Sequence, residues 1–284
     1  MATVAVRHFS DRLADAVERK RSQLVVGLDP VVERMPAALH GDLRAFCAGI
    51  VDAVADHAVA VKPQSAFFEA HGADGIRAFR DVCGYARDAG LLVIADVKRG
   101  DVGSTARAYA QAYVPLADAL TVNPYLGGDS VEPFLEACRR DGAGVFFLVK
   151  TSNPGSADVQ DVELADGRRL WQHVAGLVRG WGEDLVGDRG LSAVGAVVGA
   201  TFPREVAAAR SLLPHSVLLL PGVGAQGGTP TDLAPAFAAG PASALVSASR
   251  SVIYARPEAG GDWQSAVEAE AKRLAREVWL AASP

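Results

Sequence analysis

The chain has 284 residues, of which half are hydrophobic and 21% are charged, with a formal net charge of −5 at pH 7. Such a composition is typical of a globular protein with a large core. The length suits one α/β barrel, which typically takes about 250 residues, as well as two smaller domains. The charges form no basic blocks, which argues against general binding to nucleic acids or acidic membranes. An anionic small molecule would therefore need a local cluster of cations.

The cysteines and the apolar stretches of the sequence indicate in which cellular compartment the protein is expected. Cys47, Cys83 and Cys138 are widely separated, odd in number and free of C-x-x-C spacing. We therefore expect small buried hydrophobic residues in a reducing, cytoplasmic compartment. The first residues, MATVAVRHFSDRL, lack the apolar stretch of a secretory signal. Long uncharged stretches such as Ser211–Thr231 are interrupted by proline, histidine and glycine, so we expect no membrane span.

The first part of the chain alternates apolar runs with amphipathic periodicity. Ser10 is a suitable cap for a helix over about residues 10–21, whose apolar side we expect to close the bottom of the fold. Short apolar runs then indicate strands, and apolar residues at a period near 3.6 indicate the helices between them. The expected strands are Leu24–Leu28, His57–Val61 ending in Lys62-Pro63, and the apolar run Leu91–Ala95 that continues into Asp96. The expected helices run from Asp42 to Val54 and from Ile76 to Ala86.

The alternation continues to the end of the chain. Five more strands are expected at Ala119–Val122, Val145–Val149, Ala193–Gly199, Val217–Leu220 and Ala244–Ser247. Helices are expected around Val131–Arg140, Trp171–Leu185 and Arg204–Leu213, and a final one covers about residues 263–281. Eight strands with helices between most of them predict a parallel sheet that closes into a single-domain (β/α)₈ barrel, the barrel proper covering about residues 23–256.

One long segment, Thr151–Leu191, interrupts this alternation. Its first half reads SNPGSADVQDVELADGRR and is rich in serine, aspartate, glycine and proline. That composition predicts an extended loop after the fifth strand. Because loops of this length are uncommon unless they are functional, the segment is either an active-site lid or an insertion without function.

Charged and polar side chains gather where the strands end. In LLVIADVKRGDVGST, residues 91–105, Asp96 and Lys98 project from the same face of a strand, and the next turn can bring Asp101 towards them. Buried charges are costly unless they pair, so this cluster indicates a chemical purpose. The carboxyl ends of the strands form the catalytic face of a barrel. The other candidates at strand ends are Asp29, Lys62, Thr151, Ser152 and Arg250.

A glycine-rich segment, PGVGAQGG at Pro221–Gly228, follows the seventh strand. Glycines let backbone N–H groups face an anion, and the loops after strands seven and eight usually form the phosphate pocket of a barrel. Arg250 supplies a cation that can bind phosphate oxygens bidentately, and Gln226 supplies a neutral donor. We therefore predict a phosphorylated ligand.

The array ADVKRGDVGST, with GLDP and VAVKPQSAFFE before it and LLPGVGAQGG and SASRSVIYA after it, resembles the orotidine 5′-phosphate decarboxylase family. The segment NPYLGGDS and the long loop after Ser152 are similar to the longer bacterial branch. The resemblance covers nearly the whole barrel. It implies decarboxylation of orotidine 5′-phosphate to UMP, the last step of de novo UMP synthesis, by a homodimer that uses no metal or cofactor.

The resemblance also implies a role for each candidate residue. Lys98 would protonate C6 after CO₂ leaves, and Asp96 would lie against the departing carboxylate. Asp101 would complete the charge network and, with Thr105, would reach into the neighbouring subunit's site. The implied substrate contacts are Asp29 and Lys62 to the ribose hydroxyls, Ser152 to the pyrimidine, and Gln226 and Arg250 to the phosphate.

Three other functions stay open on the residues alone. A metal-dependent aldolase or decarboxylase of sugar phosphates could bind Mg²⁺ through Asp96 and Asp101, although the neighbouring lysines oppose a cation. A sensor could bind a nucleotide without converting it. Lys98 or Lys62 could instead form a Schiff base. On the neighbouring turns, Asp118, Asp129 and His71 are expected to be solvated surface residues.

Overall fold

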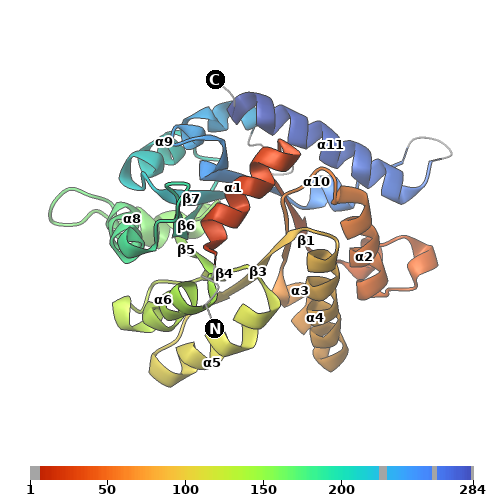
Figure 1. The fold of residues 1–284 in the computed structure, drawn as a ribbon, viewed down its shortest axis with the longest axis horizontal. Coiled ribbons are helices and arrows are strands. Elements are labelled where there is room, and N and C mark those ends of the chain that lie inside the picture. The colour runs from red at the N-terminus through yellow and green to blue at the C-terminus, as the bar shows by residue number, and fades with distance from the viewer. Residues whose placement is uncertain (1–6, 224–228, 258–260, 283–284) are drawn as a thin grey trace, which may run out of the picture.

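The computed structural model describes residues 7–223, 229–257 and 261–282. Eight parallel strands follow one another around a closed barrel, and β8 pairs with β1 to complete it. Helices surround the barrel on the outside (Figure 1). The predicted (β/α)₈ barrel is therefore confirmed. The strands are β1 Leu24–Leu28, β2 Ala60–Pro63, β3 Leu92–Arg99, β4 Ala119–Val122, β5 Gly144–Lys150, β6 Ser192–Val198, β7 Ser216–Pro221 and β8 Ala244–Ala248.

Local sequence signals explain where several helices begin. Asp42 precedes α2, and its side chain accepts a hydrogen bond from the N–H of Ala45 at 2.9 Å. Pro203 opens α9 with Glu205 in the first turn, as predicted. The α-helices are α1 Phe9–Lys20, α2 Leu43–Val54, α3 Ser65–Glu69, α4 Gly72–Asp88, α5 Gly103–Tyr113, α6 Gly128–Asp141, α7 Ala157–Gln160, α8 Leu170–Trp181, α9 Pro203–Leu212, α10 Arg250–Ile253 and α11 Trp263–Ala282. The short 3₁₀ helices are η1 Val32–Arg34, η2 Ala37–Leu39, η3 Val114–Leu116, η4 Pro154–Ser156, η5 Glu183–Leu185, η6 Pro230–Phe237 and η7 Pro241–Ser243.

Two strands carry charged residues at their carboxyl ends, as predicted. β2 reaches Pro63 and β3 reaches Arg99, and Lys62 and Asp96 are buried within them and pair with each other. The helices α3 and α5 were not predicted. In α5 only the small side chains of Ala106 and Ala110 are buried, which gives a weak helical pattern.

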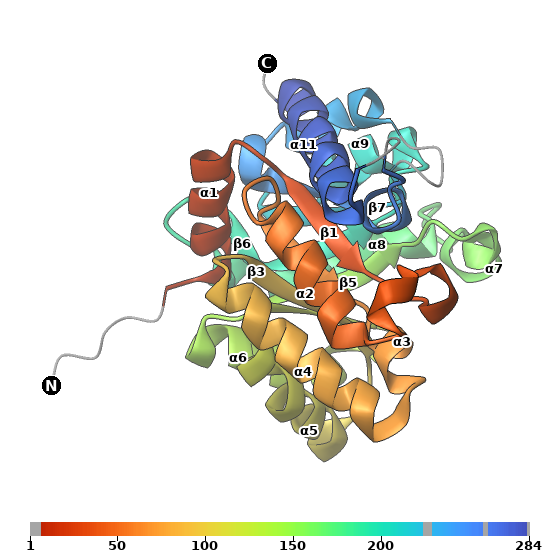
Figure 2. The same cartoon turned by 90° about the vertical axis from the view of Figure 1, so that its right-hand side faces the viewer.

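The helix α1 closes the amino-terminal end of the barrel, as predicted. Its residues Phe9, Leu13 and Val17 form one apolar cluster with strand residues that include Ile94 and Phe146. The rings of Phe9 and Phe146 meet edge to face with centroids 5.9 Å apart. Each such side chain contributes about 1.5–3 kcal/mol when fully buried. Figures 1 and 2 show α1 lying across this end of the barrel.

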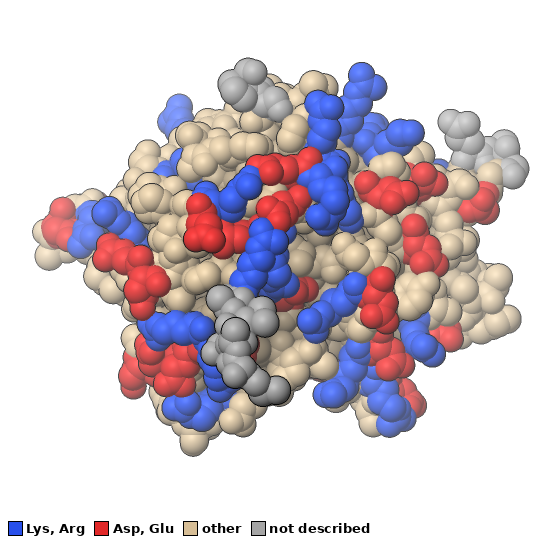
Figure 3. All heavy atoms as spheres, viewed as in Figure 1, with Lys and Arg blue, Asp and Glu red and all other residues tan. Residues whose placement is uncertain are grey.

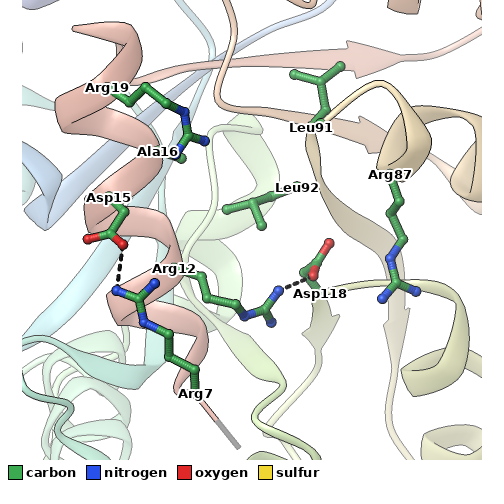
Figure 4. Close-up of a pocket in the computed structure, with 10 residues that line it drawn as sticks. Arg7, Arg12, Asp15, Ala16, Arg19, Arg87, Leu91, Leu92 and Asp118 are labelled. Atoms are coloured by element: carbon green, nitrogen blue, oxygen red, sulfur yellow. Dashed lines mark hydrogen bonds and ion pairs between the residues drawn. The ribbon is translucent and has the colours of Figure 1, made fainter.

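Two polar residues at the same end contradict the predictions. The N-cap of α1 is His8, and Ser10 lies buried inside the helix, so Ser10 is not the cap. Asp118, expected to be solvated, is only 5% exposed. It forms an ion pair with Arg12 and accepts the N–H of Val93 at 2.9 Å, because a buried carboxylate needs such partners. The pocket around Asp118, about 390 Å³, lies at the amino ends of the strands (Figure 4).

The surface and the cysteines agree with the sequence-based predictions. Figure 3 shows acidic and basic residues interspersed over the face that carries α1. In the described ranges, no helix has both the length and the hydropathy needed to cross a bilayer. His71 and Asp129 are exposed. Cys47, Cys83 and Cys138 are buried and unpaired, and burial raises the pKa of the latter two thiols to about 12.

Candidate active site

Asp96 of β3 is the centre of the candidate site at the carboxyl ends of the strands. It is 4% exposed. Its Oδ1 lies 2.5 Å from Nζ of Lys98, so the two side chains share a face as predicted. Its Oδ2 lies 2.5 Å from Nζ of Lys62 on the neighbouring strand β2, a partner that the sequence-based reasoning did not foresee. One carboxylate is therefore shared by two ammonium groups.

Two neutral donors complete the surroundings of this carboxylate. Thr121 of β4 donates its hydroxyl to Oδ1 of Asp96 at 2.9 Å. Gln64 donates its amide to Oδ2 at 3.1 Å and forms an isolated parallel bridge with Asp96. Neither residue was predicted. Gln64 could have been found, because it lies two positions after Lys62 and so projects from the same face of an extended chain.

The two lysines decide the charge state of the site. Burial alone would raise the pKa of Asp96, but attraction and hydrogen bonds from Lys62 and Lys98 outweigh it and hold that pKa well below its usual range. Burial alone would lower the pKa of Lys62, but attraction to Asp96 and Asp29 raises it above its ordinary value. At neutral pH the site therefore holds an ionised carboxylate and protonated Lys62.

The backbone of Lys98 adopts an unusual conformation. Its φ angle is 44°, in the left-handed region that costs a residue with a side chain about 1–3 kcal/mol. The register between β3 and β4 shifts between Ala95 and Arg99, and the N–H of Lys98 donates to Oγ1 of Thr121 at 3.0 Å. The bulge leaves 43% of the Lys98 side chain exposed while its ammonium group contacts Asp96. The structure thus holds Lys98 against Asp96 and leaves part of its side chain open to solvent.

Asp101 and Thr105 do not join this group within one chain. Asp101 lies partly exposed after β3, and its Oδ1 accepts the N–H of Val102 at 2.8 Å. Within the described ranges, no ion pair links Asp101 to Lys98. The predicted approach of Asp101 to the cluster is absent inside the chain because the carboxylate binds the next turn instead. Thr105 is exposed on α5.

Asp29 and Arg250 lie at neighbouring strand ends, after β1 and β8. Oδ1 of Asp29 is buried and has no hydrogen-bond partner among the described residues. Arg250 is the first residue of α10 and is exposed. The loop before it can approach β1 because a Cβ at Gly27 would collide with Oγ of Ser249. Gly27 therefore contributes to placing Arg250 at the rim.

Ser152 follows β5 and is half-buried. A Cβ at Gly199, after β6, would lie 3.0 Å from Cα of Ser152, so the glycine leaves room for the Ser152 backbone. Gly222, with a φ of 110°, is the second residue of the predicted phosphate segment Pro221–Gly228. Gln226 lies outside the described residues.

The long segment after β5 is folded more tightly than the predicted extended loop. It contains η4 and α7, and Glu163 pairs with Arg169 in an antiparallel bridge. Local backbone hydrogen bonds explain this compactness, such as Leu164 N–H to Arg168 O at 2.8 Å. Polar composition alone does not reveal such pairings.

The site is built to act on negative charge. Both oxygens of Asp96 face ammonium groups, so this carboxylate is poorly placed to bind Mg²⁺. Across the described residues, no three His, Cys, Asp or Glu side chains gather as metal ligands would. Cations fixed in a partly buried site stabilise negative charge that develops in a reaction, and an ammonium group can also supply a proton. Fold and site together define a (β/α)₈ barrel with two ammonium groups around one buried carboxylate at the face where barrel enzymes have their active sites.

Comparisons with known proteins identify the family. The sequence profile of the orotidine 5′-phosphate decarboxylase / HUMPS family matches residues 22–260, so the chain belongs to that family. The orotidine 5′-phosphate decarboxylase of Rhodopirellula baltica is 44% identical, with 92% of this chain and 95% of the relative covered. That of Deinococcus radiodurans is 45% identical, with 87% and 90% covered. The structure of Leishmania donovani OMP decarboxylase is similar with a TM-score of 0.78, 34% identity, and 96% and 98% covered. The predicted family and the predicted enzyme class, a carbon–carbon lyase, are confirmed.

Proposed function

We propose that this chain decarboxylates orotidine 5′-phosphate to UMP and CO₂ in the cytoplasm, as the last step of de novo UMP biosynthesis and without a metal or organic cofactor. The observation that carries the proposal is the Asp96 carboxylate between Lys62 and Lys98, at the rim of a barrel of this family. The names of the relatives support the same activity. The three unpaired thiols support a reducing compartment.

Lys98 is the proposed proton donor. When the bond from C6 to the carboxylate breaks, the electron pair stays on C6 and CO₂ leaves. The Lys98 ammonium group then transfers a proton to C6 and becomes a neutral amine. Because 43% of the side chain is exposed, water can return the proton. An ammonium group about 4 Å from the developing carbanion contributes roughly 4 kcal/mol at an effective dielectric constant of about 20.

Asp96 is proposed to lie against the carboxylate that departs. Its low pKa keeps it ionised, so it repels a second carboxylate and attracts the Lys98 ammonium group. The repulsion is relieved as neutral CO₂ forms, which favours the transition state over the bound substrate. In this proposal Asp96 both orients the proton donor and destabilises the bound carboxylate.

The remaining catalysis is proposed to come from binding energy at the ribose and phosphate. Enzymes lower barriers by about 8–23 kcal/mol in total, so one ammonium group is not sufficient. Asp29 and Lys62 would hold the ribose hydroxyls. The buried oxygen of Asp29 that has no hydrogen-bond partner in the described part of the chain supports that role. The proposed contacts to the rest of the nucleotide are Ser152 to the pyrimidine, and Gln226 and Arg250 to the phosphate.

Removing Arg250, the cation proposed to bind the phosphate, should weaken substrate binding and slow turnover. For Arg250→Ala we expect a higher KM and a lower kcat, because phosphate binding energy is used in the transition state. Hydrogen bonds to charged groups contribute about 1.5–3 kcal/mol, so kcat/KM should fall roughly 10-fold to 150-fold. Steady-state kinetics with orotidine 5′-phosphate measure both parameters. An unchanged profile would contradict the phosphate role.

We also propose a homodimer in which Asp101 and Thr105 enter the partner's site. Neither side chain joins the Asp96 network of its own chain within the described residues, and both lie on the exposed stretch after β3. Exposed apolar side chains suit a protein–protein contact: Val102, next to Asp101, is 52% exposed, and Tyr125, after the neighbouring strand β4, is 79% exposed. Such a dimer would supply the acid that one chain lacks.

Hybrid dimers test this arrangement. Lys98→Ala and Asp101→Ala homodimers should each be nearly inactive, because every site lacks one group. A hybrid of the two variants contains one site with both native residues. Co-expression in equal amounts should therefore restore about a quarter of the wild-type activity. Hybrids that form, as shown by two different affinity tags, yet stay inactive would contradict the shared site.

The activity itself is tested by adding orotidine 5′-phosphate to the purified chain with EDTA present and following the loss of orotate absorbance. We expect full turnover. Activity that requires added Mg²⁺ would favour the metal-dependent alternative, and nucleotide binding without turnover would favour a sensor. Substrate trapped on a lysine by borohydride would favour a Schiff base.

A further inference from the structure

Lys150, the last residue of β5, is a buried cation that the proposed mechanism does not use. Its side chain is 2% exposed, and its Nζ lies 2.8 Å from Oδ2 of Asp161 in the segment between β5 and α8. Nζ also lies 3.4 Å from Oγ of Ser156 and 5.4 Å from the ring centre of Phe202. Replacing a buried ion pair by apolar residues is often neutral or stabilising, so stability alone does not explain the pair. The pair is explained if it fixes the position of the segment that carries Asp161.

A second contact lies directly beside the first. The side chain of Gln160 accepts the N–H of Thr151 at 2.9 Å and donates to Oγ1 of Thr151 at 2.8 Å. Two consecutive residues at the end of β5 are thus bonded to two consecutive residues of the segment. Ser152 follows immediately, with Gly199 packed against its backbone. The position of Ser152 therefore depends on a backbone that the segment holds in place.

The segment itself is a small folded unit at the carboxyl ends of the strands. Val162 O accepts the N–H of Leu170 at 2.9 Å, which closes the chain between them into a loop. Figure 2 shows α7, the helix of this segment, at the end of the barrel away from α1. Asp161 lies at the end of α7, and its second oxygen lies 3.4 Å from Nη1 of Arg169. The Asp161 carboxylate thus links Arg169, at the end of the segment, and Lys150, at the end of β5.

We propose that Lys150 is a positioning residue: its ion pair with Asp161 docks residues 153–169 on the barrel and thereby places Ser152 for the pyrimidine of the substrate. This inference rests on the proposed function, since Ser152 is the proposed pyrimidine contact. Lys150 touches neither the reacting atoms nor the phosphate in this arrangement. It acts through the backbone of Thr151 and Ser152.

Two variants remove the docking pair from opposite sides. Lys150→Met keeps the length of the side chain and removes the charge, whereas Asp161→Asn keeps the shape of the carboxylate. Because a small misplacement of a substrate contact can cost about 100-fold, kcat/KM for orotidine 5′-phosphate should fall about 10-fold to 100-fold in each, with KM raised. The matched control is Asp166→Asn, which removes an exposed pair with Arg168 in the same segment and should change kcat/KM less than about twofold.

A double-mutant cycle distinguishes positioning from a general structural defect. Ser152→Ala should lower kcat/KM in the wild-type background. In the Lys150→Met background the same change should alter kcat/KM less than about twofold, because Ser152 is already misplaced. Fully additive effects would overturn the proposal that Lys150 acts through Ser152.

Limited trypsin digestion tests the docking without any assay of activity. Arg168 and Arg169 offer cleavage sites within the segment, and both are about half exposed. Cleavage there should be at least about tenfold faster in Lys150→Met, which keeps the partners of both arginines, than in the wild-type chain. If Lys150→Met does not fold, Asp161→Asn carries the test through cleavage after Arg168 alone, because Arg169 itself pairs with Asp161. Unchanged cleavage in a folded variant would overturn the docking role, whereas absent turnover in the wild-type chain would reject only the proposed function.

Discussion

Lys98→Ala should lower kcat for orotidine 5′-phosphate at least about 1,000-fold while UMP still binds. A positioned general acid contributes typically 10²-fold to about 10⁴-fold, and a charge aimed at a developing anion contributes about 10²-fold to 10³-fold more. Lys98 is proposed to supply both effects. It acts after the nucleotide has bound, so the proposed phosphate and ribose contacts stay intact. Product formation is measured by orotate absorbance, and UMP binding by calorimetry.

The fold should survive this substitution. Asp96 keeps its contacts with Lys62, Gln64 and Thr121, and the lost ammonium group is 43% exposed. Arg140→Ala is the control, because it removes another exposed cation, paired with Asp141, on the outer helix α6. We expect the control to keep full activity. A Lys98→Ala variant with turnover close to wild type would reject Lys98 as the proton donor.

The barrel could be predicted because its signals are local. Strands such as Val145–Val149 are continuous apolar runs, since parallel strands are covered on both faces. The observed β5 extends that run by one residue on each side. The beginning of the second strand was predicted less well. It was expected from His57, but β2 begins at Ala60 because the N–H groups of His57 and Ala58 still donate to Val54 O at the end of α2.

The candidate site could be predicted only in part. The spacing of Asp96 and Lys98 places both on one face, and the structure brings them within 2.5 Å. The contacts from Lys62, Gln64 and Thr121 depend on how β2, β3 and β4 align, and a sequence does not show that register. Local spacing therefore finds pairs within a strand and misses pairs between strands.

Buried charges outside the site were missed for the same reason. Asp118 lies one residue before β4 and looks like a surface turn in the sequence, but Arg12 of α1 covers it. Lys150 at the end of an apolar run is matched by Asp161 eleven positions later. In each case the partner comes from another element, so burial becomes visible only when the elements are packed.

The second substitution for which we expect a large effect is Asp96→Asn, which should destabilise the fold and also lower activity. Asparagine has the shape of aspartate but no charge. Its carbonyl oxygen could accept from only one of the ammonium groups of Lys62 and Lys98, and its NH2 group would face the other. Lys62 is only 8% exposed in its side chain, so it would become a buried charge that has lost its ion-pair partner. Breaking a buried pair in this way costs about 3–5 kcal/mol. Urea unfolding measures the loss, and Asp141→Asn, in an exposed pair, should lose at most about 1 kcal/mol.

The pH dependence of the stability difference between wild type and Asp96→Asn shows whether charge or packing causes that difference. The folded pKa of Asp96 is depressed, so its stabilising contribution is present above the unfolded pKa near about 4 and is lost as the pH falls through the folded value. The folded pKa of Lys62 is raised, so its contribution is present below about pH 10 and is lost as the pH rises through the folded value. The stability gap between wild type and Asp96→Asn should therefore be flat from about pH 5 to 9 and shrink in acid and in strong base. A gap that is independent of pH would mean that packing, not charge, is lost.

Activity separates the structural role of Asp96 from its proposed role in the reaction. If Asp96 only positions Lys98, Asp96→Ala should lower kcat and leave substrate affinity unchanged. If it also repels the substrate carboxylate, Asp96→Ala should lower kcat while orotidine 5′-phosphate binds more tightly relative to UMP, because only the substrate carries that carboxylate. Direct binding of both nucleotides in the Lys98→Ala background, where turnover is blocked, makes the comparison possible. We expect the tighter relative binding of the substrate, and unchanged turnover in Asp96→Ala would remove Asp96 from the mechanism altogether.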